Sequence, residues 1–124
     1  MDTPGSEKKR AKRIAHHFIL YARQANPLEP TGDWDVSTIT NISKTGVFFH
    51  SFHNYKLGSK LEIRLILSVQ KKCMCWGIVV RCLPSKRIKN TYEVAVALSD
   101  IEEESKKAFD ETLEFFIQKE EEKK

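Results

Sequence analysis

Hydrophobic and polar residues alternate along much of this chain, and the period of the alternation changes only near the C-terminal end. Between residues 61 and 68, leucine and isoleucine occupy every second position, which is the pattern of a strand with one face in a core. Shorter runs rich in β-branched and aromatic residues predict further strands. The predicted strands cover residues 14–22, 36–40, 47–51, 61–68, 73–83 and 92–98.

Two of these predicted strands carry additional signals. In the first strand, Phe18, Leu20 and Ala22 share one face, which we expect to point into the core. In the long strand at 73–83, Gly77 indicates a bulge or a bend. The segments between strands contain prolines, glycines and lysines typical of surface loops.

After Leu98 the spacing of apolar residues becomes helical. Phe109, Leu113 and Phe116 fall at i, i+4 and i+7, and acidic residues occupy the other side, so an amphipathic helix is predicted. Ser99 or Ser105 is expected to cap its N-terminus. Six strands in meander-like order followed by one helix favour a mainly β fold, a barrel covered at one end by the helix.

The length and composition indicate one folded domain with polar ends. The chain has 124 residues, of which 40% are hydrophobic and 31% charged. We expect a flexible basic arm at 1–12, the folded domain at 13–118 and a frayed charged tail at 119–124. Three cysteines without a secretory signal suit the cytoplasm, and no apolar run is long enough for membrane insertion.

The net charge of +4 is distributed unevenly. Five basic residues crowd the N-terminus, whereas the C-terminal part is acidic. The basic residues are Lys8, Lys9, Arg10, Lys12 and Arg13. A local cluster on a chain of modest net charge favours a discrete anionic ligand over a long polyanion, although a solvated tail has the same composition.

The stretch from Asn41 to Gly46 lies between two apolar runs and reads as the turn of a hairpin. Asn41 and Ser43 can bond the backbone of that turn or a ligand above it, and Gly46 can take positive φ. An ordinary β-turn has the same residues, so the stretch alone leaves both interpretations open. If the first strand runs beside the hairpin, the basic segment can fold over this turn and form one site for an anion and a purine.

Signals for enzymatic chemistry are poor. The sequence has neither a glycine-rich phosphate loop nor a nucleophile-elbow motif, so we expect no enzyme and no cofactor. Cys73 and Cys75 share a strand face, and a zinc site would need Cys82 or the pair His16 and His17 to complete it. Buried strand cysteines are the simpler interpretation, and no metal is expected.

At these residues the chain resembles the PilZ domain, a bacterial receptor module for cyclic di-GMP. The family pattern is Arg-x-x-x-Arg before the first strand and Asp/Asn-x-Ser-x-x-Gly in the region of the second and third strands. The stretch from Asn41 to Gly46 matches the second motif in full. The layout also matches over residues 8–117, including the closing strand and the amphipathic helix.

The resemblance implies a six-stranded antiparallel β-barrel with a C-terminal helix and a cyclic di-GMP site. Arg13 with Lys9 or Arg10 would hold phosphates and a guanine, and Asn41 and Ser43 would bond the other base or its ribose. Gly46 would keep the turn open. Ordering of the basic arm around the second messenger would change the surface shown to an unidentified protein effector.

The sequence departs from the family pattern at Lys9, which stands where the leading arginine is expected. Lysine keeps the charge but lacks the bidentate fork. A further departure is Ala95 and Leu98, where the family often has glycine and phenylalanine. The alternative is therefore a degenerate PilZ domain that does not bind cyclic di-GMP and acts as a protein-interaction module in motility or pilus assembly.

A third hypothesis is a small barrel that binds nucleic acid by stacking bases on aromatic side chains. The candidate aromatic residues are Trp34, Phe48, Phe49, Phe52 and Tyr55. Core packing explains most strand aromatics, so we expect no long nucleic acid as a partner. The apolar stripe of the predicted helix is compatible with a monomer or with a weak dimer.

Overall fold

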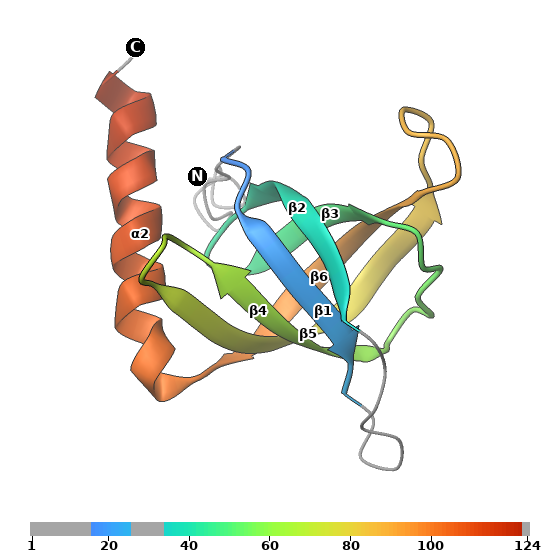
Figure 1. The fold of residues 1–124 in the computed structure, drawn as a ribbon, viewed down its shortest axis with the longest axis horizontal. Helices are drawn as coiled ribbons and strands as arrows, with labels where there is room; N and C mark the ends of the chain where they lie inside the picture. Colours follow the sequence, from blue (N-terminus) through green and yellow to red (C-terminus); the bar gives the residue numbers. More distant parts are fainter. Residues whose placement is uncertain (1–15, 26–33, 123–124) are drawn as a thin grey trace, which may run out of the picture.

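The computed structural model describes residues 16–25 and 34–122 of the chain. Six strands are followed by one helix (Figure 1). The elements are β1 (Ile19–Gln24), β2 (Asp35–Ile42), β3 (Gly46–Ser51), β4 (Lys60–Ile66), β5 (Lys72–Pro84), β6 (Tyr92–Ile101) and α2 (Glu103–Glu122).

The strands form a closed antiparallel barrel with the order β1-β2-β3-β6-β5-β4. This confirms the predicted six-stranded barrel with a C-terminal helix. The expected meander is interrupted once, because β3 pairs with β6 and the chain then crosses to β4. Pairing of β4 with β1 closes the barrel, so the β3–β4 connection spans its end instead of forming a hairpin.

The first strand begins later than predicted, at Ile19, and continues to Gln24. Before it, the Phe18 N–H donates to the His16 carbonyl in a tight turn, which takes residues 16–18 out of the ladder. The expected inward face is nevertheless confirmed, because Phe18, Leu20 and Ala22 are all buried. The alternating strand from Leu61 likewise buries every apolar position assigned to the core.

Gly77 lies at a register shift between β5 and β6, as the sequence predicted, although Ser99 on β6 is the extra residue. The close approach of the two strands at this point requires glycine, because a Cβ there would lie 2.7 Å from the Ala97 carbonyl oxygen. The packing of the two backbones therefore leaves no room for a side chain at position 77.

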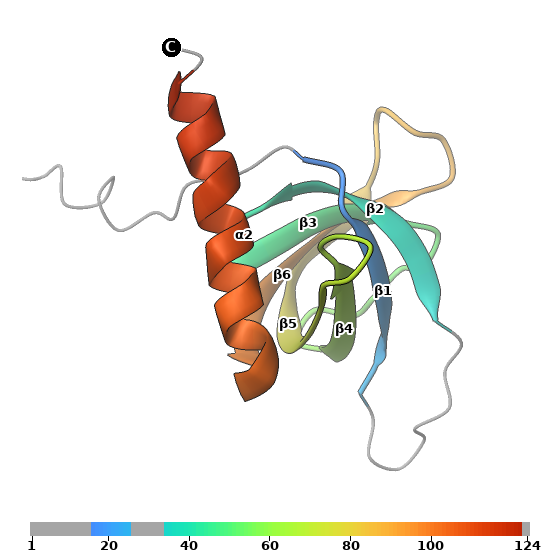
Figure 2. The same cartoon turned by 60° about the vertical axis from the view of Figure 1, so that its left-hand side comes forward.

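Helix α2 stands against one end of the barrel, beside the β4–β5 turn (Figures 1 and 2). Phe109 and Leu113 are completely buried in the common core, and Phe116 packs against its edge. This stripe therefore covers the barrel and is not free to form a dimer seam. The helix continues past Gln118, the expected end of the folded domain, to Glu122.

The start of α2 is fixed by Ser105, but not as a cap. Its hydroxyl donates to the Glu102 carboxylate and accepts the Met74 N–H, at 3.1 Å each. The Glu102 carbonyl accepts the N–H groups of Ser105 and Lys106, so Glu102 occupies the capping position. The expected caps, Ser99 and Ser105, were thus wrong, and Ser105 instead attaches the helix to the start of β5.

Candidate functional site

A bulge in β2 determines the direction of the first motif residue. Ile39 pairs with Phe49 and Asn41 pairs with Phe48, so Thr40 is an extra residue without a partner in the register. Side chains two apart on a regular strand share a face, which would direct Asn41 inward with buried Ile39. The bulge reverses this relation and turns Asn41 to the outside of the barrel.

A second bulge, in β5, does the same for an arginine. Val79 pairs with Val96 and Arg81 pairs with Ala95, which leaves Val80 as the extra residue. Val79 is buried in the core, whereas Arg81 is exposed. The two bulges thus direct one amide and one guanidinium to the same outer face.

A row of outward side chains joins these two positions. The pairings run from Asn41 to Phe48, from Phe48 to Ala95 and from Ala95 to Arg81, across β2, β3, β6 and β5. The row contributes to a surface groove of about 220 Å³, which we call the strand groove. Its lining residues are Thr40, Asn41, Phe48, Phe49, His50, Arg81, Arg87, Glu93 and Val94.

Two buried polar atoms in the strand groove have no hydrogen-bond partner among the described residues. They are Asn41 Oδ1 and His50 Nε2. The other ring nitrogen of His50 lies 3.3 Å from Thr40 Oγ1, and Nε2 is 3.9 Å from Glu93 Oε2, beyond hydrogen-bond distance. Leaving a buried polar atom unpaired costs about 1–3 kcal/mol, and a ligand whose binding turns these side chains toward a hydrogen-bond partner would recover that cost.

The strand groove also has a local excess of positive charge. Arg81 and Arg87 are exposed at its rim, and Glu93 is the one acidic residue of the lining. A guanidinium fork matches phosphate oxygens or the O6 and N7 acceptors of guanine. The groove therefore combines an apolar wall at Phe48, unpaired polar atoms and cations.

Other residues of the predicted motif hold the turn instead of lining the groove. Ser43 is buried, its N–H donates to the Gly46 carbonyl at 2.9 Å, and its hydroxyl accepts the Thr45 N–H at 3.2 Å. The turn thus consists of residues 43–45, and Asn41 belongs to β2.

Gly46 begins β3 and does not take the positive φ that glycine allows, since among the described glycines only Gly58 does. Its role is different: a Cβ at Gly46 would lie 3.0 Å from the Val96 carbonyl oxygen of β6. Glycine at this position lets the turn approach β6 closely, and the Leu98 N–H donates to the Thr45 carbonyl at 2.9 Å.

The basic residues Lys9, Arg10 and Arg13 lie outside the described residues, but the segment that follows them is placed. His17 Nδ1 is 3.0 Å from the Ile39 carbonyl oxygen, and the Ile39 N–H donates to the Phe18 carbonyl at 2.8 Å. Residues 16–18 therefore run beside β2, two residues from Asn41. The structure thus places residues 16–18, which follow the basic segment in the sequence, near the Asn41 end of the strand groove.

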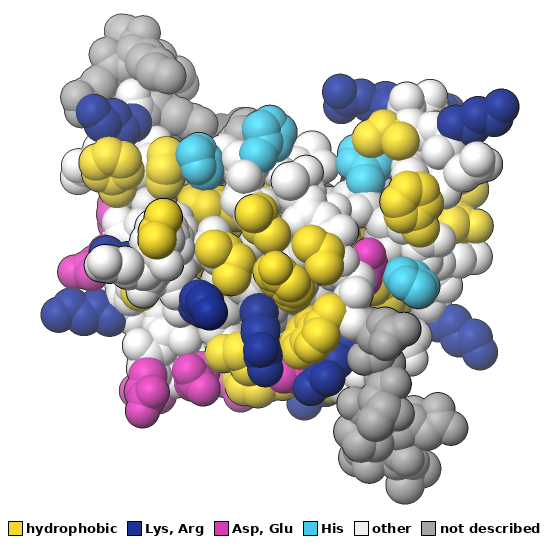
Figure 3. Space-filling model, viewed as in Figure 1, with side chains coloured by type: hydrophobic (Ala, Val, Ile, Leu, Met, Phe, Trp, Pro, Cys, Tyr) yellow, Lys and Arg dark blue, Asp and Glu magenta, His cyan; other side chains and the backbone are white. Residues whose placement is uncertain are grey.

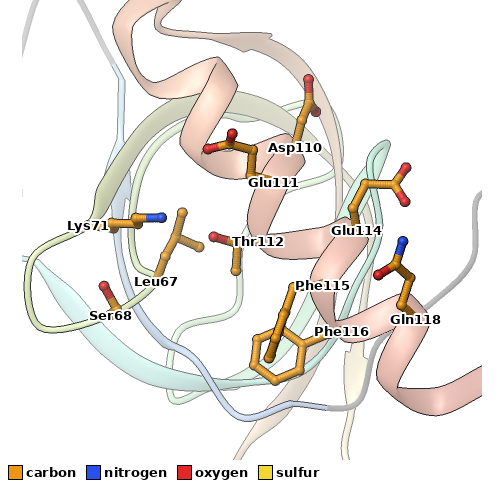
Figure 4. A pocket seen from close by; sticks show the side chains of 10 residues that line it. All are labelled: Leu67, Ser68, Lys71, Asp110, Glu111, Thr112, Glu114, Phe115, Phe116 and Gln118. Carbon is orange, nitrogen blue, oxygen red and sulfur yellow. The ribbon is translucent and has the colours of Figure 1, made fainter. Parts of the chain in front are cut away.

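A second hollow of about 700 Å³ lies between α2 and the β4–β5 turn, and we call it the helix groove (Figure 4). Phe115 and Phe116 extend toward the side of Leu67 and Ser68, and carboxylates lie along the helix above them. The lining residues are Leu67, Ser68, Lys71, Asp110, Glu111, Thr112, Glu114, Phe115, Phe116 and Gln118. Its acidic and apolar character contrasts with that of the strand groove.

The aromatic residues considered for nucleic-acid binding do not form one exposed platform. Phe49 and Tyr55 are buried in the core. Hydrophobic, lysine and arginine side chains gather on the face of β1 and β4 (Figure 3). Trp34 lies there against Tyr21 and Arg23 of β1 and Arg64 of β4. Its ring already has Arg23 at 4.2 Å and Arg64 at 4.7 Å.

The candidate metal ligands that the structure describes do not gather into one site. Cys73 and Cys75 are fully buried, and a hydrogen bond from Cys75 to the Cys73 sulfur, together with burial, raises the pKa of Cys75. Within the described ranges no three His, Cys, Asp or Glu side chains are grouped to hold a metal ion. In the same part of the chain, α2 is too polar to be a membrane-spanning helix.

Sequence reasoning missed His50, Arg81, Arg87 and Glu93 as members of a site. Each looks like an ordinary polar residue of a strand or loop, and only the pairing of β3 with β6 and the two bulges bring them to Asn41. One signal could have indicated a bulge next to Arg81. Buried Val79 and partly buried Cys82 both pack in the core although they are three positions apart in β5, whereas residues of a regular strand share a face only at even spacings.

Comparisons with known proteins agree with this architecture. The solved structure of Bacillus subtilis inhibitor of motility (MotI/DgrA) superimposes with a TM-score of 0.71 at 12% identity, covering 94% of this chain and 53% of that chain. The chain thus spans about half the length of that protein, and the likeness concerns the fold. No curated relative matches the sequence. The family model for the PilZ domain matches residues 7–115, so the chain belongs to the PilZ domain family.

Proposed function

We propose that this PilZ domain binds cyclic di-GMP in the strand groove and signals the bound state to a protein partner. The observation that carries the proposal is the pair of buried, unpartnered atoms, Asn41 Oδ1 and His50 Nε2, in a groove rimmed by Arg81 and Arg87. Membership of the family makes cyclic di-GMP the first ligand to consider.

The chemistry of the strand groove suits a guanine nucleotide. Guanine carries N–H donors that the Asn41 carbonyl oxygen would accept, and its O6 and N7 are acceptors for a histidine N–H or an arginine fork. Phe48 supplies an apolar surface beside these groups. The phosphates would then be neutralised by the rim arginines and by the basic residues of the N-terminal segment.

The N-terminal residues Lys9, Arg10 and Arg13 are assigned to the same ligand. Arg13 precedes His17 by four residues, a span of at most about 14 Å for an extended chain. His17 is itself hydrogen-bonded to Ile39, so this tether holds Arg13 within reach of the Asn41 end of the strand groove. Ser43 and Gly46 support the site by holding the turn against β6.

The partner is proposed to be a protein, and likeness in fold to an inhibitor of motility makes motility the first pathway to test. Lys9 in place of the family's arginine supports the second candidate, a degenerate domain that acts as an interaction module without the ligand. The two candidates differ in one measurable quantity, the affinity for cyclic di-GMP.

Isothermal titration of the full chain with cyclic di-GMP at physiological salt tests the proposal. We expect binding that Arg13→Ala abolishes and that Lys8→Ala, a matched loss of charge outside the motif, weakens only slightly. Lys9→Arg restores the bidentate fork and should strengthen binding about fivefold or more, in line with the roughly 1–3 kcal/mol of a good bidentate contact.

Two results would contradict the proposal. The absence of heat and of NMR shifts at high ligand concentration, for the wild type and for Lys9→Arg, would favour the degenerate interaction module. Equal affinities for wild type, Arg13→Ala and Asn41→Ala would show that the ligand binds elsewhere on the chain.

A further inference from the structure

The helix groove is apolar at its floor and acidic along one side. Leu67, Phe115 and Phe116 supply the apolar surface, and Phe115 remains 53% exposed. Asp110, Glu111 and Glu114 supply carboxylates on α2. Such a surface suits a segment that carries several cations on long aliphatic side chains.

The charges of the helix groove are only partly compensated by described residues. Lys71 lies on the opposite wall, and Glu114 Oε1 is 3.5 Å from Lys44 Nζ in an ion pair exposed on both sides. No ion pair of Asp110 or Glu111 occurs within the described part of the chain. The chain itself contains the complementary charge, because five of the six residues from 8 to 13 are Lys or Arg.

The described end of the N-terminal segment lies against the same helix groove. The ring of His16 stacks on Phe116 with centroids 4.3 Å apart, and Phe18 contacts Phe116 edge to face at 5.6 Å. Immediately afterwards, His17 is hydrogen-bonded to Ile39 of β2. His16, where this described range begins, thus lies between the helix groove and the strand groove.

We propose that, without ligand, residues 8–13 of this chain occupy the helix groove, with their cations against Asp110, Glu111 and Glu114. From His16 an extended segment of about 8 residues reaches at most roughly 28 Å, which exceeds five helical turns of α2. Residues 8–13 can therefore lie along the acidic side of the helix without displacing His16 from Phe116.

The consequence for signalling rests on the function proposed above. The same arginines cannot hold phosphates in the strand groove and carboxylates in the helix groove, so ligand binding draws residues 8–13 away from α2. Docking on α2 and ligand binding are therefore mutually exclusive.

Paramagnetic relaxation in the full chain tests the position of the segment directly. In a Cys82→Ser background, a spin label at Val69→Cys, a 98% exposed position of the β4–β5 turn, lies next to the helix groove. A label at Phe52→Cys, 76% exposed after β3, is the control. We expect the amide signals of residues 8–13 to broaden with the first label and not with the second.

Charge variants on α2 provide a matched pair. Glu111→Lys changes a lining residue, whereas Glu104→Lys makes the same charge change on an exposed residue outside the helix groove. Glu111→Lys should abolish the broadening, as should about 1 M salt, where the screening length falls to about 3 Å. Because docking competes with ligand binding, Glu111→Lys should also tighten cyclic di-GMP binding about two- to tenfold relative to Glu104→Lys.

The outcomes separate this inference from the proposed function. Broadening that responds to Glu111→Lys but a chain that binds no cyclic di-GMP would support the docking and refute the ligand. Equal or absent broadening with both labels would overturn the docking, even if the ligand binds with high affinity. Broadening found only when spin-labelled chains are mixed with separate isotope-labelled chains would overturn it too, because the occupant would be a second copy.

Discussion

Replacing Asn41 by alanine should stabilise the free protein while weakening ligand binding. The wild-type side chain buries Oδ1 without a partner among the described residues, a cost of about 1–3 kcal/mol. Alanine removes that cost and loses some packing of a half-buried amide, so we expect a net gain of about 1 kcal/mol. For a domain of this size the gain corresponds to an increase in Tm of roughly 3–5 °C.

The effect on the complex has the opposite sign. Without Oδ1, an N–H of the bound base is left unpaired in the strand groove, which costs about 1–3 kcal/mol, or roughly a 5- to 150-fold loss of affinity. Thermal unfolding and titration calorimetry on the same preparation measure both quantities. A substitution that removes a binding residue is expected to stabilise the free protein where that residue has an unpaired polar group in the absence of ligand.

Ser43→Ala is the control, because the Ser43 hydroxyl already accepts the Thr45 N–H. Its loss should destabilise the free protein by about 1 kcal/mol, as expected for a satisfied hydrogen bond. If Asn41→Ala lowers Tm as much as Ser43→Ala does, the Asn41 oxygen is satisfied in solution. The strand groove would then lose the observation on which its assignment depends.

Three further predictions concern the barrel. Gly77→Ala places a Cβ 2.7 Å from a carbonyl oxygen of β6 and should lower the free energy of unfolding by about 1–3 kcal/mol. Urea titration measures this change, and an unchanged midpoint would show that β5 and β6 can move apart without cost. Burial, followed by the nearby Asp35 carboxylate, raises the pKa of Tyr55, so its contribution to stability is complete below pH about 10 and is lost as the pH rises further. Tyr55→Phe should therefore flatten the alkaline decline in Tm, and an equally steep decline would contradict this. In the native protein iodoacetamide should modify half-buried Cys82 first and Cys75 only on unfolding, which mass spectrometry of peptides can resolve, and early labelling of Cys75 would refute its burial.

The strands could be predicted because their alternation is determined locally. Leu61, Ile63 and Leu65 are all fully buried, in agreement with their period of two, and the helix stripe at Phe109 and Leu113 follows from its spacing. These patterns depend only on which face of an element meets the core. They carry no information on which strand becomes the neighbour of which.

The candidate site depends on which strands are neighbours, and the alternation of apolar residues does not show this. Asn41 was recognisable from its motif, but Arg81 reaches it only because β3 pairs with β6 and because Thr40 and Val80 are inserted as bulges. A motif cannot distinguish a glycine needed for positive φ from one needed for a close approach of strands, and the structure shows the second role for Gly46. Tertiary packing determined both results.

Closure of the barrel limits how a partner can recognise this domain. β1 is hydrogen-bonded to β2 on one side and to β4 on the other, so in the described part of the chain every strand has two neighbours. A protein that recognises its targets by extending their sheets would find no free row of backbone N–H and C=O groups. Partner choice must then depend on side chains, and exchange of a few exposed residues on α2 could redirect the domain to a new effector while the barrel stays unchanged.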